Sequence, residues 1–353
     1  MKKIEMVDLK GQYEQIKEEV NQSILETIES TLFINGPKVK SFQDHLEKYL
    51  GVKNVIPCAN GTDALQIALM SLGLKPGDEV ITADFTFAST VEVISLLRLT
   101  PVLVDVDPNT FNIDISSIEK AISPKTKAII PVHLFGQAAD MQEILDIAEE
   151  NKLYVVEDNA QSLGAVYTFA DGNKKKTGTL GHIGTTSFFP SKNLGAYGDG
   201  GAIFTNDDDL AHIIRGIVNH GMYIRYQHDV VGVNSRLDSL QAAILDIKLK
   251  KLDFYNDSRK VAAQKYNERL IDCQKLITPH RKGDQYTHVY HQYTLKVIDG
   301  DRDGLVNHLN DKGIPCGVYY PIPLHLQKAY VRDNYKDDDF KVTLEIVDQV
   351  ISL

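Results

Sequence analysis

Lys192 and Asp158 each follow a run typical of a buried β-strand, Thr185–Phe189 in the first case and Leu153–Glu157 in the second. Open α/β sheets bind their ligands at the carboxyl ends of the strands. An enclosed lysine has a lowered pKa, so its neutral amine can condense with an aldehyde. A carboxylate can keep a pyridine nitrogen protonated, which makes the ring an electron sink. Taken singly, Lys192 also fits a surface loop, and Asp158 also fits a helix cap.

A segment earlier in the chain has the character of a phosphate-binding turn. Asn60–Leu65 joins a short strand around Val55 to a helix, and Gly61 allows a ligand to approach the free N–H groups at the helix start. Ser187 can add a hydroxyl to the same phosphate, and Gln161 can donate a hydrogen bond to a ring oxygen. A plain turn with a helix cap, and a polar surface side chain at Gln161, explain these residues equally well.

These residues can form one site only if a sheet brings the ends of their strands together. Apolar residues at helical spacing predict an amphipathic helix over Gln12–Leu32, ended by Gly36 and Pro37. Short strand-like runs then alternate with helical stretches, and several runs are apolar throughout, as in parallel sheets covered on both faces. The expected strands are Glu79–Thr82, Pro101–Asp105, Lys127–His133, Leu153–Glu157, Thr185–Phe189 and Ala202–Thr205.

The downstream third of the chain predicts a second, smaller α+β domain. Its pattern is a helical tract over Leu237–Leu270, a strand over His288–Val297, a helix over Asp303–Lys312 and a strand at Cys316–Tyr320. We expect a large α/β domain over residues 1–250 and a small α+β domain over residues 251–353.

Composition excludes several other classes of protein. The net charge is −10 and no run of Lys and Arg is large enough for nucleic acid or an anionic membrane, so Lys174–Lys176 is expected to be a solvated loop. The three cysteines lack the spacing of disulfides or zinc sites, and no other metal-binding spacing occurs. Residues 1–10 lack the apolar stretch of a signal peptide, which predicts a cytoplasmic protein. His133 and His288 are expected to be structural histidines.

Taken together, these segments resemble the DegT/StrS-type sugar aminotransferases of the fold-type I pyridoxal-phosphate class, over about Met6 to Leu353. The resemblance implies that Lys192 is the catalytic residue and holds pyridoxal 5′-phosphate as a Schiff base. It implies that Asp158 pairs with the ring nitrogen and that Gln161 sits beside the ring oxygen. Phe87, in the segment Asp84–Phe87, corresponds to the aromatic side chain that stacks on the ring.

The resemblance also implies a homodimer with shared active sites. Gly61, Thr62 and Ser187 match the phosphate cradle of the family, and Asn234 in Val233–Asp238 matches an asparagine that the neighbouring subunit donates. The active site then requires two copies of the chain.

Within the family, the chain resembles members that aminate C3 of a nucleotide-linked sugar, with L-glutamate as amino donor and pyridoxamine phosphate as intermediate. The favoured acceptor is UDP-2-acetamido-2-deoxy-3-oxo-glucuronate, in bacterial polysaccharide or O-antigen (lipopolysaccharide) biosynthesis. Arg236 would bind the uronate carboxylate as a bidentate partner. Tyr319, next to Tyr320, stands where such members have a histidine, and a tyrosine carries no charge at neutral pH.

Two further sugar contacts are expected from the resemblance. His325 is similar to a residue of enzymes acting on dTDP-3-oxo-6-deoxyhexoses, which makes such a sugar the alternative acceptor. Tyr226, in the loop Met222–Asp229, is a candidate substrate contact and fits a polar surface position equally well.

Three rival functions are alternatives to this interpretation. A sugar 3-dehydratase of the same fold needs histidine in place of Lys192. A nicotinamide-dependent oxidoreductase needs a GxGxxG fingerprint after the first strand, and the sequence has none there. A non-catalytic regulatory protein of the same fold would bind the cofactor without converting it with glutamate.

Overall fold

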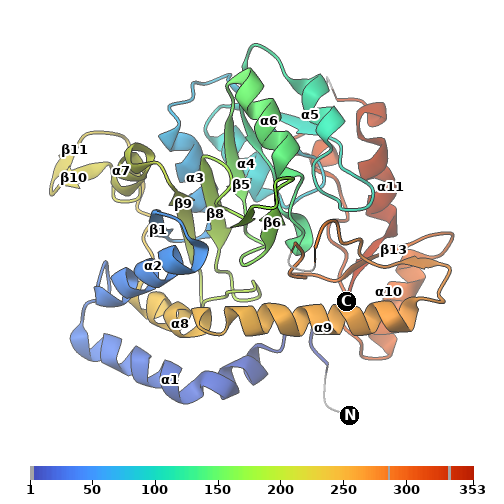
Figure 1. Cartoon of the computed structure of the whole chain (residues 1–353), viewed down its shortest axis with the longest axis horizontal. Helices are drawn as coiled ribbons and strands as arrows, with labels where there is room; N and C mark the ends of the chain where they lie inside the picture. The colour runs from blue at the N-terminus through green and yellow to red at the C-terminus, as the bar shows by residue number, and fades with distance from the viewer. Residues whose placement is uncertain (1–3, 285–286, 333–334) are drawn as a thin grey trace.

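The computed structural model describes residues 4–284, 287–332 and 335–353, and its centre is one mostly parallel sheet (Figure 1). The strands of this sheet are β1 (Asn54–Cys58), β2 (Glu79–Ala83), β3 (Thr100–Val104), β4 (Thr126–Ile130), β5 (Tyr154–Asp158), β8 (Ile183–Ser187) and β9 (Gly201–Thr205). Their spatial order is β1-β9-β8-β5-β4-β2-β3. β9 runs antiparallel to both neighbours, and the other neighbouring pairs are parallel.

Helices cover both faces of this sheet because its strands are apolar on both sides. Ala128 and Ile130 of β4 pack with one helical layer, whereas Ile129 between them packs with the other. The first layer is α3 (Gly61–Ser71), α4 (Ser89–Leu96) and α7 (Asp208–Ile217); the second is α5 (Ile115–Ala121) and α6 (Met141–Asn151). This arrangement confirms the expected α/β fold class.

Four further helices lie at the lower edge of the sheet in Figure 1. They are α1 (Leu9–Ser30), α2 (Pro37–Leu50), α8 (Ser239–Leu249) and α9 (Leu252–Leu270). α2 and α8 share a hydrophobic cluster, and α1 packs on the other side of α8. The helical tract expected over residues 237–270 is therefore two helices, and we propose that the boundary between large and small domains lies between α8 and α9.

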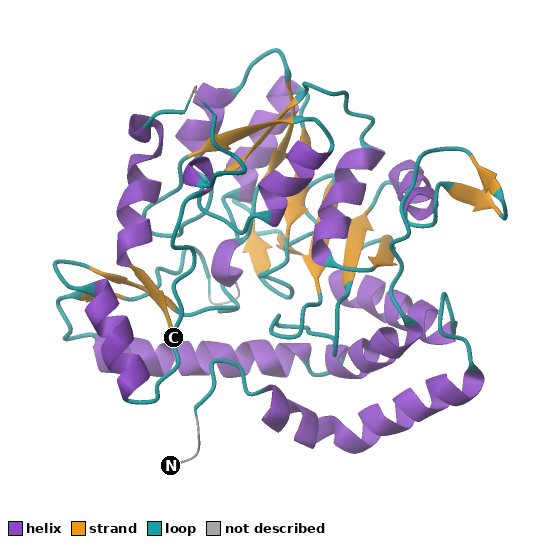
Figure 2. Cartoon of the chain, turned by 180° about the vertical axis from the view of Figure 1, so that it is seen from behind, coloured by secondary structure: helices purple, strands orange, loops and turns teal. Residues whose placement is uncertain are grey.

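The C-terminal part is built on a small antiparallel sheet beside α9, which both views show (Figures 1 and 2). Its strands have the order β12-β13-β14, and Ala263 of α9 shares a hydrophobic cluster with β13. The elements of this part are β12 (Leu276–Ile277), β13 (Thr294–Val297), α10 (Arg302–Asp311), α11 (Lys341–Gln349), β14 (Val350–Ser352) and the short 3-10 helices η2 (Leu324–Leu326) and η3 (Asp337–Phe340). A further short 3-10 helix, η1 (Leu134–Gly136), lies between β4 and α6.

Two expectations about local structure were wrong. No strand forms at Cys316–Tyr320 in the described chain, where Gly317 makes only an isolated bridge to Ser352. The prolines that follow, at positions 321 and 323, have no N–H group with which to continue a ladder. The second error concerns Lys174–Lys176, which forms β7 and pairs with β6 (Val166–Thr168) instead of a loop.

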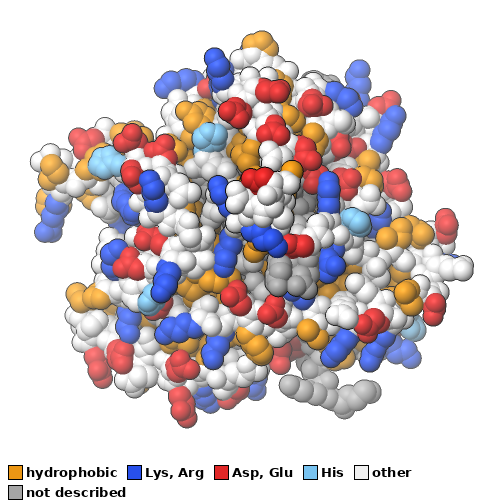
Figure 3. All heavy atoms as spheres, in the orientation of Figure 1, with side chains coloured by type: hydrophobic (Ala, Val, Ile, Leu, Met, Phe, Trp, Pro, Cys, Tyr) orange, Lys and Arg blue, Asp and Glu red, His pale blue; other side chains and the backbone are white. Residues whose placement is uncertain are grey.

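The surface carries acidic and basic side chains side by side on the face that Figure 3 shows. A hairpin of β10 (Met222–Ile224) and β11 (Gln227–His228) projects from the molecule beside α7 (Figure 1). Among the described helices, none is both long and apolar enough to cross a membrane.

A buried polar network holds the end of β5. Nδ1 of His133 accepts a hydrogen bond from the Ala139 N–H (3.1 Å), so Nε2 carries the ring proton and donates to Glu157 (2.9 Å). The Glu157 carboxylate also accepts three backbone N–H groups within residues 178–181, each at 2.7 Å. Because His133 and Glu157 are fully buried, this network is a structural anchor for Asp158, the next residue.

We expect Glu157→Ala to lower the free energy of unfolding by about 3 kcal/mol or more, because it leaves buried donors without acceptors. Glu149→Ala, at an exposed position on α6, is the matched control and should stay within about 0.5 kcal/mol of the wild type. Urea unfolding followed by far-UV circular dichroism measures both. Equal losses in the two variants would contradict the anchoring role.

Candidate active site

A cavity of about 500 Å³ opens where the carboxyl ends of the large sheet's strands meet the C-terminal part. Such a position is the usual ligand site of an open α/β sheet. The structure brings most of the residues predicted from the sequence into the wall of this cavity: Gly61, Thr62, Phe87, Asp158, Gln161, Ser187, Lys192, Tyr319 and Tyr320.

One end of the cavity has the shape and chemistry of a phosphate cradle. Asn60 caps α3 by accepting the Asp63 N–H (2.8 Å), which leaves the N–H groups at the helix start directed outward. A Cβ added to Gly61 would lie 2.6 Å from the Cβ of Ser187, so only glycine allows this approach. The Ser187 hydroxyl lies at the same end, and these groups together suit an anionic phosphate.

Asp158 is the last residue of β5, and its carboxylate is buried. Its oxygens accept the Thr90 hydroxyl (3.0 Å) and the Ala160 N–H (3.1 Å). Burial nevertheless raises the pKa of this carboxyl, against the lowering effect of these bonds and of Lys192. A carboxylate in this state is stabilised by a cationic hydrogen-bond donor, as a protonated pyridine nitrogen would be.

Lys192 lies across the cavity in a loop that the rest of the fold holds. Burial lowers the pKa of its amine to about 8, although the Asp158 carboxylate acts in the opposite direction. Lys248 of α8 donates to the carbonyl of Gly195, and the Asn193 side chain donates to Asn256 of α9 (2.7 Å). The Lys192 amine therefore loses its proton more readily than that of an ordinary lysine, which favours its use as a nucleophile.

The remaining wall is aromatic and amide. The ring of Phe87, 56% exposed, lies 6.1 Å from that of Tyr320. Gln161 accepts the Phe135 N–H (2.7 Å) and donates its amide to the Tyr320 hydroxyl (3.1 Å), so its orientation is fixed by two partners. The donor of Gln161 thus reaches Tyr320, and Phe87 is free to lie against a planar ligand.

Four predicted residues do not line this cavity within one chain. Arg236 donates to the side chain of Asn219 (2.9 Å), its Nε is buried without a partner, and Asn234 forms a bridge to Asn219. Tyr226 is 76% exposed on the projecting hairpin. The position of His325 corrects the sequence-based expectation of a sugar contact, because its side chain is buried against Asp84 (2.6 Å).

Two residues of the cavity wall escaped the sequence analysis. His291 and Gln292 line it, and each has a buried polar atom without a hydrogen-bond partner. Burial lowers the pKa of His291 well below its usual value, so the imidazole is neutral. No local signal marks them, because their residue types fit the strand expected over residues 288–297, whereas β13 begins only at Thr294.

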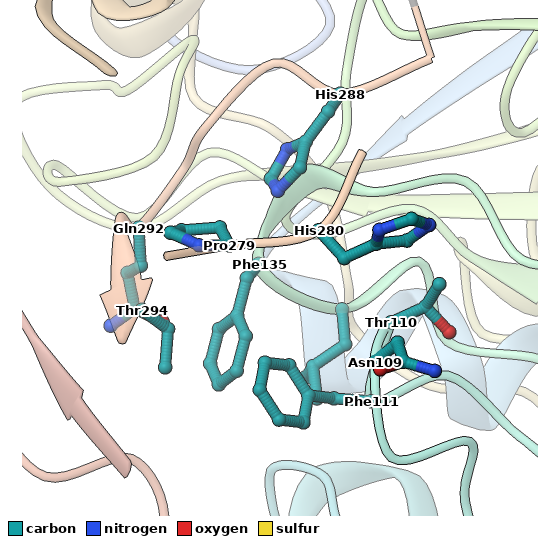
Figure 4. Close-up of a pocket in the computed structure, with 10 residues that line it drawn as sticks. Asn109, Thr110, Phe111, Phe135, Pro279, His280, His288, Gln292 and Thr294 are labelled. Carbon is teal, nitrogen blue, oxygen red and sulfur yellow. The ribbon is translucent and has the colours of Figure 1, made fainter. Parts of the chain in front are cut away.

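A separate space next to Gln292 of this wall is too small for a ligand. Gln292, Phe135 and His288 line this space of about 10 Å³, which holds at most one water molecule (Figure 4). His288 is buried and stacks on Tyr290, in agreement with a structural role. The cavity at Lys192 is therefore the better candidate for catalysis.

Together, the mostly parallel sheet and the lysine, aspartate and phosphate cradle at its edge define an aminotransferase dependent on pyridoxal 5′-phosphate. The chain belongs to the DegT/DnrJ/EryC1/StrS aminotransferase family, whose model matches residues 14–353.

Three curated relatives cover nearly the whole chain. A Geobacillus stearothermophilus protein named pleiotropic regulatory protein is 46% identical, with 99% of this chain and 92% of the relative covered. The UDP-2-acetamido-2-deoxy-3-oxo-D-glucuronate aminotransferase of Pseudomonas aeruginosa is 47% identical, with 94% and 90% covered. The UDP-N-acetyl-3-dehydro-alpha-D-glucosamine 3-aminotransferase of Acidithiobacillus ferrooxidans is 43% identical, with 93% and 86% covered.

Solved structures show the same fold. A DegT/DnrJ/EryC1/StrS aminotransferase from Brucella abortus is 40% identical, with a TM-score of 0.93 and coverage of 99% of this chain and 93% of the other. NtdA from Bacillus subtilis, solved with the bound cofactor PMP, is 34% identical, with a TM-score of 0.91 and coverage of 100% and 80%.

The lowered pKa of Lys192 predicts how the cofactor-free protein reacts with acetic anhydride. Acetylation of Lys192 should rise through about pH 8, because only the neutral amine reacts. Asp158→Asn removes a negative charge that favours the ammonium form of Lys192, so the pH at which acetylation is half-maximal should fall. Peptide mass spectrometry measures both, with the exposed Lys250 as an internal reference. A midpoint near the ordinary lysine value of 10.5 would contradict burial as the cause.

Proposed function

We propose that this protein transfers an amino group from L-glutamate to the 3-oxo group of a nucleotide-linked sugar, with UDP-2-acetamido-2-deoxy-3-oxo-glucuronate as the favoured acceptor. The observation that carries the proposal is that Lys192, Asp158 and a phosphate cradle line the same cavity. The curated names of two relatives, both 3-aminating enzymes for UDP-linked sugars, support the choice of acceptor. We place the reaction in the cytoplasm, in bacterial polysaccharide or O-antigen (lipopolysaccharide) biosynthesis.

The residues of the cavity fit pyridoxal 5′-phosphate, which supplies an aldehyde and an electron sink when bound. Asp158 would hold the ring nitrogen in its protonated form, and Phe87 would lie against the ring. Lys192 would bind the aldehyde of the cofactor. Its amine, when free, would move the proton at the reacting substrate carbon.

The phosphate of the cofactor is assigned to residues from two chains. Gly61, Thr62 and Ser187 hold it from one subunit, and Asn234 of the partner subunit completes the cradle. This assignment explains why Asn234 does not line the cavity of its own chain. The projecting position of Tyr226 suits the same homodimer, in which each hairpin reaches the other subunit.

The direct test of the activity uses the two halves of the reaction. Glutamate should convert the aldehyde absorbance of the wild-type protein to that of the pyridoxamine form. Addition of the 3-oxo uronate, of UDP-3-oxo-N-acetylglucosamine or of dTDP-3-oxo-6-deoxyglucose should then restore it with the true acceptor. Recovery only with the deoxyhexose would overturn the favoured acceptor in favour of the alternative. A protein that binds the cofactor but never reacts with glutamate would instead be a regulatory homologue, as the name of one relative suggests.

Lys192→Ala should abolish both half-reactions while leaving the fold intact, because the variant has no amine to release the cofactor or move the proton. Lys265→Ala, an exposed change on α9, is the control and should keep the wild-type rates. Absorbance measures the turnover and circular dichroism the fold. Near-normal turnover in Lys192→Ala would exclude the proposed mechanism.

Arg236 is proposed to bind the uronate carboxylate of the sugar in the partner's cavity. Its Nε is buried without a hydrogen-bond partner in the single chain, which leaves donor capacity for a carboxylate. Tyr319 lines the cavity where related enzymes have a histidine and can add one neutral hydrogen bond.

Arg236→Gln should therefore lower kcat/KM for the uronate about 10- to 100-fold, the usual effect of losing a hydrogen bond to a charged group. With UDP-3-oxo-N-acetylglucosamine, which has no carboxylate, the same variant should change little. Steady-state kinetics with the two acceptors measure the difference. An equal loss with both acceptors would show that Arg236 does not recognise the carboxylate.

A further inference from the structure

The C-terminal part is joined to the end of β2 by one buried pair of side chains. Asp84 directly follows β2, and its carboxylate accepts both the backbone N–H of His325 (2.7 Å) and the imidazole Nδ1–H (2.6 Å). The neighbouring Leu324 N–H donates to the Asp84 carbonyl (3.2 Å). Both side chains are almost fully buried, at 0% and 3% exposure, so little solvent competes for these bonds.

A second contact fixes the plane of the imidazole. The ring of His325 stacks on Phe340 with 4.2 Å between centroids, and Tyr335 packs edge-on against Phe340. The Tyr335 hydroxyl in turn bonds to the backbone of β3, donating to Pro101 (3.0 Å) and accepting from Leu103 (3.1 Å). His325 is therefore held from two sides by elements of the large sheet and of the C-terminal part.

This pair connects the two segments that carry Phe87 and Tyr320, which both line the cavity. Asp84 is followed by Phe85 and Phe87, and His325 is preceded by Tyr320 on a short segment. The ring of Tyr320 lies 6.1 Å from each of those two phenylalanine rings. A shift of the segment that carries His325 would therefore move Tyr320 against the wall that carries Phe87.

Tyr320 ends a chain of hydrogen bonds that begins at the backbone. The Phe135 N–H donates to Gln161 (2.7 Å), and the Gln161 amide donates to the Tyr320 hydroxyl (3.1 Å). Burial raises the pKa of Tyr320, so the hydroxyl keeps its proton. Since this oxygen already accepts from Gln161, its own hydrogen is available to an acceptor in the cavity.

We propose that His325 is a positioning residue that acts through Tyr320: its bond to Asp84 sets the place from which the Tyr320 hydroxyl donates to an oxygen of the molecule bound in the cavity. The inference rests on the proposed aminotransferase function and adds a new role to the same site. It assigns His325 to the placement of a donor and not to direct contact with the sugar.

Two variants separate the hydrogen bond of His325 from its stacking. His325→Asn keeps a donor at the position of Nδ1 and loses the ring, whereas His325→Phe keeps the ring on Phe340 and loses the donor. We expect the rate constant of the glutamate half-reaction to fall about 10- to 100-fold in His325→Phe, the effect of a small displacement of the Tyr320 hydroxyl. His325→Asn should stay within about threefold of the wild type, as should His308→Phe, the same change at an exposed position on α10.

A double-mutant cycle with Tyr320→Phe decides whether His325 acts through Tyr320. If it does, the double variant should be no slower than Tyr320→Phe alone. Multiplied losses would overturn the proposal and give His325 a separate role. Equal losses in His325→Phe and His325→Asn would also overturn it, since stacking would then matter instead of the donor.

Amide hydrogen exchange in the cofactor-free protein provides a readout independent of activity. Exchange of the peptide covering residues 319–326 should be faster in His325→Phe and unchanged in His325→Asn. If the wild-type protein fails to react with glutamate, the proposed function fails, and the exchange comparison still tests the positioning. Unchanged exchange in His325→Phe would show that the bond to Asp84 does not hold the segment.

Discussion

The site depends on one electrostatic constraint, the desolvation of a carboxylate and an amine in the same cavity. Burial raises the pKa of Asp158 and lowers that of Lys192, so the fold makes the charged form of each group costly. A planar ligand with a protonated ring nitrogen and an aldehyde gives the first group a cationic partner and binds the second covalently. Glu157, the residue before Asp158, anchors the end of β5, and the contacts of Lys248 and Asn193 hold the loop of Lys192.

Features encoded by neighbouring residues could be predicted from the sequence. Continuous apolar runs indicated a parallel sheet with both faces covered, and the sheet has that form. The polar residues that follow two of those runs, Asp158 and Lys192, line one cavity, because parallel strands end at the same edge. The glycine at position 61 was expected to let a ligand approach the helix start, and the structure adds a second reason for it, since a side chain there would meet Ser187.

Features that depend on distant partners could not be predicted in the same way. Asp84 and His325 are 241 positions apart, so no local pattern indicated that His325 turns away from the cavity. The strand expected at Cys316–Tyr320 was wrong because the prolines after it and the contact with Asp84 lead the chain to the cavity instead. The roles of Asn234 and Arg236 require a second copy of the chain and stay predictions.

The most direct test of the account is to find which lysine holds the cofactor. Lys248 is the instructive competitor, since burial lowers its pKa to about 8 as well, yet its amine donates to the Gly195 carbonyl and does not line the cavity. The protein loaded with pyridoxal 5′-phosphate is reduced with borohydride, digested and mapped by mass spectrometry. The account predicts the pyridoxyl group on Lys192 alone. A label on Lys248 or on surface lysines, with Lys192 unmodified, would contradict it.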